Sequence, residues 1–233
     1  MNTTIPISIL AQPDDTTCGP TCLHTIYQFY GDEVSLPALI SEIQHLQGGG
    51  TLGAFLGSHA LRRGYDCTIF TYNLMIFDPT WFGEDASFIK NKLELQSEVK
   101  PDAKIQVASS AYSEFLDLGG ALRHEVLRPS LIRKYLNLGV PILVGLSATY
   151  LYGCKREFGP NSDYDDIRGE PAGHFVVLHG YNKKTRSVWV ADPLQSHPFG
   201  PEPVYELGID RVINAILLGV LTYDANLIVI EPK

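Results

Sequence analysis

The sequence predicts an α+β fold in which a helix near the N-terminus packs on a mostly antiparallel sheet. Apolar residues recur at helical spacing over 23–30, directly after Cys18. Later in the chain, two mostly apolar runs at 173–181 and 187–193 flank a short polar segment, as the two strands of a hairpin do. We therefore expect the helix to bring a cysteine to the sheet that contains these late strands.

The length and composition are those of an ordinary globular protein. The 233 residues, 45% hydrophobic and 19% charged, are predicted to form a single domain over 1–233, with a helical half over about 1–138 and a sheet-rich half over about 139–233. Lys plus Arg is 18 and Asp plus Glu is 26, so the formal net charge is −8. This charge argues against a nucleic-acid partner and is compatible with basic substrates. We predict no membrane span, because no run of about 18 apolar residues occurs.

The other elements follow from apolar periodicity and from the glycines and prolines between segments. The predicted helices cover 36–46, 51–63, 88–99, 108–118, 129–138 and 207–219, and the predicted strands cover 5–10, 65–72, 141–147 and 225–230. The polar segment between them at 153–173 is expected to be a loop that faces the substrate, because long loops without secondary structure are uncommon unless they are functional or disordered.

Four cysteines occur at irregular spacing, at Cys18, Cys22, Cys67 and Cys154. This pattern does not indicate a disulfide framework, and residues 1–10 lack the basic start and the length of a signal peptide, so a cytoplasmic location is expected. A zinc site would need a second close pair of ligands. Four acidic residues in 153–173 could bind a cation, but a solvated acidic loop is the commoner case. The sequence therefore predicts no metal and no cofactor.

Cys18 lies at or next to the start of its helix. Thr16 and Thr17 are residue types that cap helices, and Pro20 suits a first helical turn. The free amides and the positive end of the helix dipole favour a thiolate there, and the thiolate is the nucleophilic form of cysteine. A nucleophile of this kind needs a base and a group that orients the base, and both can come from distant parts of the chain.

The late hairpin offers that pair. If its turn is centred on Lys183, Tyr181 pairs with Thr185 and, counting outward, His174 pairs with Asp192. Residues that are opposed in this way share a face, with Cβ atoms about 4.5–5.5 Å apart. A slip of one residue would move Asp192 to the other face, so the loop length is a testable part of the prediction.

Four short motifs resemble one family of enzymes. The motifs are Gln12, Cys18-Gly-Pro, Gly-His174-Phe-Val-Val and Ala-Asp192-Pro, in this order. They resemble the papain-like cysteine peptidases that process bacteriocin leaders at a double glycine. The resemblance implies a papain-like fold, with Cys18 as nucleophile, His174 as base, Asp192 as the orienting group and Gln12 in the oxyanion hole. Because no transporter domain is recognisable, a stand-alone member of the family is expected.

The predicted function is therefore that of a cysteine peptidase or amidase that acts on a peptide or amide substrate through a thioester acyl-enzyme. Two alternatives stay open. An amine acceptor would make the same triad an acyltransferase or a peptide ligase, and loss of catalysis would leave a peptide-binding module on a peptidase-like fold. The sequence does not determine the oligomeric state.

Overall fold

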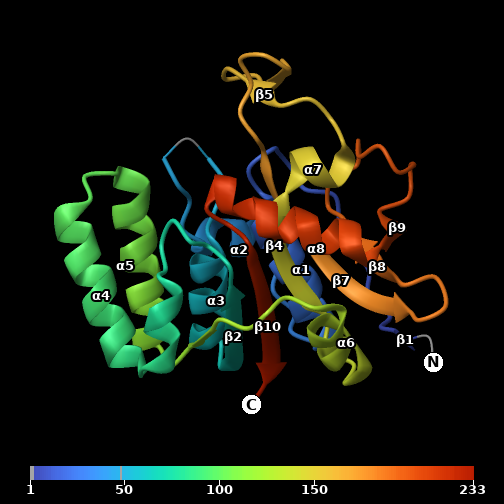
Figure 1. Ribbon diagram of the computed structural model, residues 1–233. Helices are drawn as coiled ribbons and strands as arrows, with labels where there is room; N and C mark the ends of the chain where they lie inside the picture. Colours follow the sequence, from blue (N-terminus) through green and yellow to red (C-terminus); the bar gives the residue numbers. More distant parts are fainter. Residues whose placement is uncertain (1–2, 48) are drawn as a thin grey trace.

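A computed structural model describes residues 3–47 and 49–233 (Figure 1). At its centre is a sheet of strand order β3-β2-β10-β4-β7-β8-β9, with β1 also paired to β7. Its neighbouring strands are antiparallel, apart from the parallel pair β2 and β3. The strands are β1 Thr3–Thr4, β2 Tyr65–Thr71, β3 Ala121–Arg123, β4 Ile142–Ser147, β7 Gly173–Asn182, β8 Ser187–Ala191, β9 Val204–Gly208 and β10 Asn226–Pro232. The predicted α+β class with a mostly antiparallel sheet is confirmed.

Helices cover both faces of this sheet (Figure 1). One face packs against α1, α3 and α5, and the other packs against α6 and α8. The α-helices are α1 Cys18–Phe29, α2 Leu36–Glu42, α3 Gly53–Arg62, α4 Ala86–Val99, α5 Ala103–Asp117, α6 Pro129–Asn137, α7 Ala148–Tyr152 and α8 Ile209–Leu218. Two short 3-10 helices, η1 Pro79–Gly83 and η2 Gly219–Thr222, and a small hairpin of β5 Glu157–Phe158 and β6 Asp163–Tyr164 complete the elements. No helix within residues 3–47 or 49–233 is both long and apolar enough to cross a membrane.

Strand β10 shows how the two cores are divided. Ile228 and Ile230 belong to the core under α1 and α3, and Leu227 and Val229 belong to the core under α6 and α8. Successive side chains of a strand point to opposite faces, so a continuous apolar run fills both cores. The strand predicted over 225–230 corresponds to β10.

Several predicted boundaries are wrong. The strand expected over 5–10 is absent, and the two-residue strand β1 lies just before this segment. Strand β4 pairs with β7 as far as Leu178, so β1 pairs only with the two residues at 180–181. Helix α3 begins at Gly53 and not at Thr51, whose hydroxyl donates to the Gln44 carbonyl. The segment expected as a helix over 207–219 begins with β9, which was not predicted.

The predicted register of the late hairpin is also wrong. Tyr181 pairs with Val188 and Asn182 with Ser187, so the loop at 183–186 has four residues and not three. Carried along both strands, that register would place Asp192 on the opposite face from His174. A β-bulge at His179 shifts the pairing by one residue, so that Val177 pairs with Ala191. The bulge thereby returns Asp192 to the face that carries His174.

Candidate active site

Cys18 is the first residue of α1 and is half-buried. Thr17 is at the N-cap position, but its hydroxyl donates to the Asp14 carbonyl at 3.1 Å and, among the described residues, no side chain caps the helix. The amides of the first turn are therefore not used by a cap. Gly19 lets this end of the helix approach Thr51 closely, because a Cβ at Gly19 would lie 2.6 Å from a Thr51 methyl group.

His174 and Asp192 form a buried pair at the end of the sheet. The His174 Nε2 atom lies 2.8 Å from Asp192 Oδ1. Burial opposes charge on the imidazole, but the Asp192 carboxylate outweighs burial and, with a smaller contribution from the Cys18 thiol, raises the pKa of His174 to about 10. Burial also disfavours the Asp192 carboxylate, yet His174 and the hydrogen bonds to it lower the pKa of Asp192 to about 2. An imidazolium paired with a carboxylate is the state that this geometry favours.

Two tyrosines hold Asp192 from the side away from the imidazole. The hydroxyls of Tyr152 and Tyr205 donate to Asp192 Oδ2 at 2.8 and 2.5 Å, and the Leu194 amide donates to Oδ1 at 2.9 Å. Burial beside the carboxylate raises the pKa of both tyrosines, so they stay protonated donors. Sequence reasoning did not find these tyrosines, because Tyr205 is in the unpredicted strand β9 and Tyr152 is in α7, a helix that was not predicted.

Gln12 lies in the loop before α1. Its backbone amide donates to the Pro193 carbonyl at 3.0 Å, which ties the loop to the residue after Asp192. Its side-chain Nε2 donates one hydrogen to the Asp14 carbonyl at 2.9 Å. Among the described residues, the second hydrogen of this amide has no acceptor, so one side-chain donor of Gln12 is left to use near the cysteine loop.

A cleft of about 610 Å³ joins these elements. Cys18 and His174 both line this cleft. The loop before α1 contributes Asp14 and Asp15 to the lining, and the small hairpin contributes Glu157. The predicted loop at 153–173 thus contains a hairpin that contributes to the cleft.

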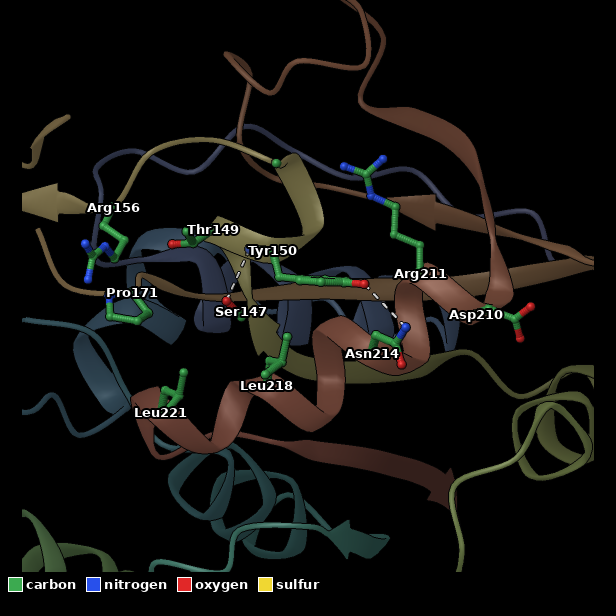
Figure 2. Close-up of a pocket in the computed structure, with 11 residues that line it drawn as sticks. Ser147, Thr149, Tyr150, Arg156, Pro171, Asp210, Arg211, Asn214, Leu218 and Leu221 are labelled. Atoms are coloured by element: carbon green, nitrogen blue, oxygen red, sulfur yellow. Dashed lines mark hydrogen bonds between the residues drawn. The ribbon is translucent and has the colours of Figure 1, made fainter. Parts of the chain in front are cut away.

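A second cavity of about 660 Å³ lies between α7 and α8 (Figure 2). Figure 2 shows Tyr150 and Asn214 joined by a hydrogen bond, with Arg211 on the same helix as Asn214. Of the described residues that line this cavity, none is a cysteine or a histidine. It therefore offers no thiol and imidazole, and the cleft at Cys18 is the candidate active site.

The other cysteines differ from Cys18 in their surroundings. Cys22 and Cys67 are fully surrounded by protein, and Cys22 donates to the Phe175 carbonyl at 3.2 Å. Burial raises the thiol pKa of Cys22, Cys67 and Cys154. These three thiols are therefore poor nucleophiles at neutral pH.

The acidic residues of the 153–173 loop are engaged with their own loop. Asp165 accepts hydrogen bonds from the amides of Ile167 and Arg168 and from the Arg168 guanidinium. In the part of the chain that the structure describes, no three His, Cys, Asp or Glu side chains are grouped as metal ligands. The Asp165 carboxyl thus stabilises the loop itself, and Asp166 forms an ion pair with Lys155 of the same loop.

Comparison with known proteins agrees with this fold. The model of the Peptidase_C39 like family matches residues 102–200, which include His174 and Asp192 but not Cys18 or Gln12. A putative C39-like peptidase from Bacillus anthracis has the same fold, with a TM-score of 0.54 and 13% identity over 99% of this chain and 98% of that one. The resemblance to the C39-like peptidases is confirmed.

Two further C39-like structures align with lower scores. The peptidase domain of Streptococcus ComA, a bifunctional ABC transporter, gives a TM-score of 0.45 and 14% identity over 97% of this chain and 98% of that chain. A double glycine motif protease from an AMS/PCAT transporter, solved in complex with the leader peptide, gives a TM-score of 0.47 and 9% identity over 99% of this chain and 95% of that chain. No curated protein matches the chain at a significant level.

Proposed function

We propose that this chain is a cysteine peptidase or amidase in which Cys18 is the nucleophile, His174 the base and Asp192 the group that orients it. The observation that carries the proposal is the buried His174–Asp192 pair beside the thiol. The Nε2 atom of His174 is hydrogen-bonded to Asp192, so the other ring nitrogen, Nδ1, is the one that can exchange a proton with Cys18. The C39-like fold and family match support a peptidase.

The reaction follows from this arrangement. The Cys18 thiolate attacks the carbonyl carbon, a C–S bond forms, and the carbonyl electron pair moves to oxygen. The Cys18 backbone amide and the free hydrogen of Gln12 Nε2 donate to that oxygen. The intermediate collapses with cleavage of the C–N bond, and the His174 imidazolium gives its proton to the leaving amine. Water, deprotonated by His174, then hydrolyses the thioester and releases a carboxylic acid and the Cys18 thiol.

The rate of Cys18 alkylation by dilute iodoacetamide tests the proposal without a known substrate. We expect Cys18 to be labelled faster than Cys22, Cys67 and Cys154 at pH 5.5, as read by peptide mass spectrometry, and His174→Ala to abolish this advantage. His124→Ala is the matched control, because His124 bonds to the Thr71 carbonyl outside the cleft.

The opposite result is equally clear. If Cys18 is labelled slowly at acidic pH and its rate rises only near the pKa of an ordinary thiol, about 8.5, in wild type and in His174→Ala alike, the thiol has no base partner and the proposed mechanism is wrong.

A further inference from the structure

The cleft contains one buried carboxyl that the proposed reaction does not use. Asp224 lines the cleft together with Cys18 and His174, and only 5% of its surface is exposed. Its Oδ1 atom has no hydrogen-bond partner among the residues that the structure describes, and the nearby Thr222 hydroxyl donates to the Gly219 carbonyl at 3.1 Å. Burial raises the pKa of Asp224 well above its usual range. A carboxyl left without partners at this depth costs free energy, and a positive charge held close to it offsets part of that cost.

The backbone around Asp224 is shaped to hold the carboxyl in this position. Its two neighbours, Tyr223 and Ala225, have φ values of 65° and 57°, in the left-handed region that is unfavourable for a residue with a Cβ. Two glycines leave it room. A Cβ at Gly145 would lie 2.9 Å from the Asp224 Cβ, and a Cβ at Gly173 would lie 2.9 Å from its Oδ2. The carboxyl therefore occupies space that two neighbouring strands leave open for it.

The rest of the cleft is acidic as well. Asp14 and Asp15 line it beside Cys18, and Glu157 lines it from the hairpin. Burial raises the pKa of Glu157, and the negative charge of Asp15 raises it further, so the two carboxyls repel each other through the cleft. Of the described residues that line the cleft, none is a lysine or an arginine, and the positive charge comes from the His174 imidazolium, which opposes the rise in the pKa of Glu157 and of Asp224. A second cation bound in the cleft would relieve the remaining repulsion.

Building on the proposed function, we infer that the cleft selects peptides with an arginine or lysine side chain close to the scissile bond, and that Asp224 receives its cationic group. A guanidinium or ammonium group supplies the positive charge that a desolvated carboxylate needs, and it donates to Oδ2, the oxygen that lies next to Gly173 in the lining of the cleft. The carboxyls of Asp15 and Glu157 also line the cleft and attract the same charge. Asp224 is thus a residue that determines specificity and takes no part in the bond-breaking steps.

Matched affinity reagents test this inference. The reagents are N-acetylated tetrapeptidyl chloromethyl ketones of alanine that carry either arginine or citrulline at one of the four positions. Citrulline keeps the shape of arginine without its charge, and acetylation removes the free amino terminus as a rival cation. The rate of Cys18 alkylation at pH 7 is the readout. We expect the arginine reagent to react at least tenfold faster than its citrulline counterpart at one position.

Two variants assign the selectivity to a residue. Asp224→Asn should reduce the arginine-to-citrulline ratio to below threefold. Asp66→Asn removes the same charge at an exposed position on β2 and should leave the ratio unchanged. Thermal melting shows whether each variant is folded. Because a neutral amide replaces a buried carboxyl, Asp224→Asn should melt no lower than wild type at pH 7, so a loss of selectivity would not reflect unfolding.

The outcomes separate the two proposals. If iodoacetamide labels Cys18 in a manner that depends on His174 but the ratio is near one at all four positions in wild type, the selectivity inference is overturned and the proposed mechanism stands. A ratio that survives in Asp224→Asn also overturns the role of Asp224. Labelling of Cys18 that does not depend on His174 contradicts the proposed function itself.

Discussion

The hydroxyl of Tyr205 should stabilise the fold measurably through Asp192. Tyr205→Phe removes the donor that lies 2.5 Å from Asp192 Oδ2 and keeps the ring, which packs on Phe199 with ring centroids 4.7 Å apart. A hydrogen bond to a charged group contributes roughly 1.5–3 kcal/mol, and Tyr152 continues to donate to the same oxygen. We therefore expect the free energy of unfolding to fall by about 2 kcal/mol, or the Tm by roughly 4–8 °C for a chain of this size.

Urea denaturation at pH 7, followed by fluorescence, measures this change if the m-value is the same in both proteins. Tyr150→Phe is the control, because its hydroxyl accepts a 3.3 Å hydrogen bond from Asn214 at the surface, and its loss should cost under about 0.5 kcal/mol. A double-mutant cycle with Asp192→Asn should show a coupling of about 1 kcal/mol, since the hydroxyl then meets a neutral acceptor. A loss under about 0.5 kcal/mol, or zero coupling, would refute the argument that Tyr205 acts through a charged Asp192.

Three further predictions concern the same region. Asp192→Asn should slow Cys18 alkylation at pH 5.5 by about 100-fold, because removing the carboxylate destabilises the buried imidazolium by roughly 3 kcal/mol. An unchanged rate would contradict the triad. The Asp192 carboxylate raises the pKa of His174 from 6.5 to about 10, so the ion pair stabilises the fold fully below pH 6.5 and this stabilisation is lost by pH 10. Urea titrations should show that wild type loses more free energy of unfolding over this window than Asp192→Asn does. Equal losses would exclude the ion pair. Gly145→Ala should cost about 1–3 kcal/mol in the same titration, because its Cβ would lie 2.9 Å from that of Asp224, and no loss would show that the carboxyl can move aside.

The sequence predicted the helix at Cys18 and the closeness of His174 and Asp192, and the reasons for the two successes differ. The helix has clear periodicity and a proline in its first turn, so local physics determines it. The closeness of the pair was predicted from a wrong register. The longer loop and the bulge at His179 compensate each other. Gly180, next to the bulge, is the residue type in this segment that could have signalled it, because glycine inside a strand often marks a bulge.

The residues that sequence reasoning missed depend on distant parts of the chain. Tyr205 is on β9, an edge strand that contains Glu206 and follows a segment rich in proline, so its pattern is weak. Asp224 is recognisable only in the folded structure. Its Oδ1 atom has no hydrogen-bond partner among the described residues, and the two glycines that leave it room, Gly145 and Gly173, are far from it in sequence. Its neighbours adopt left-handed backbone without being glycine, so the usual signal of such a turn is missing.

Because of the bulge at His179, the number of residues between His174 and Asp192 determines whether the two side chains share a face of the sheet. Inserting or deleting two residues at the tip of the hairpin would leave the histidine and the aspartate facing the same way. A change of one residue would separate them unless a bulge were gained or lost at the same time. Odd and even spacings of this pair in related chains should therefore differ in whether β7 is bulged, so the number of residues between the histidine and the aspartate indicates the local shape of the strand.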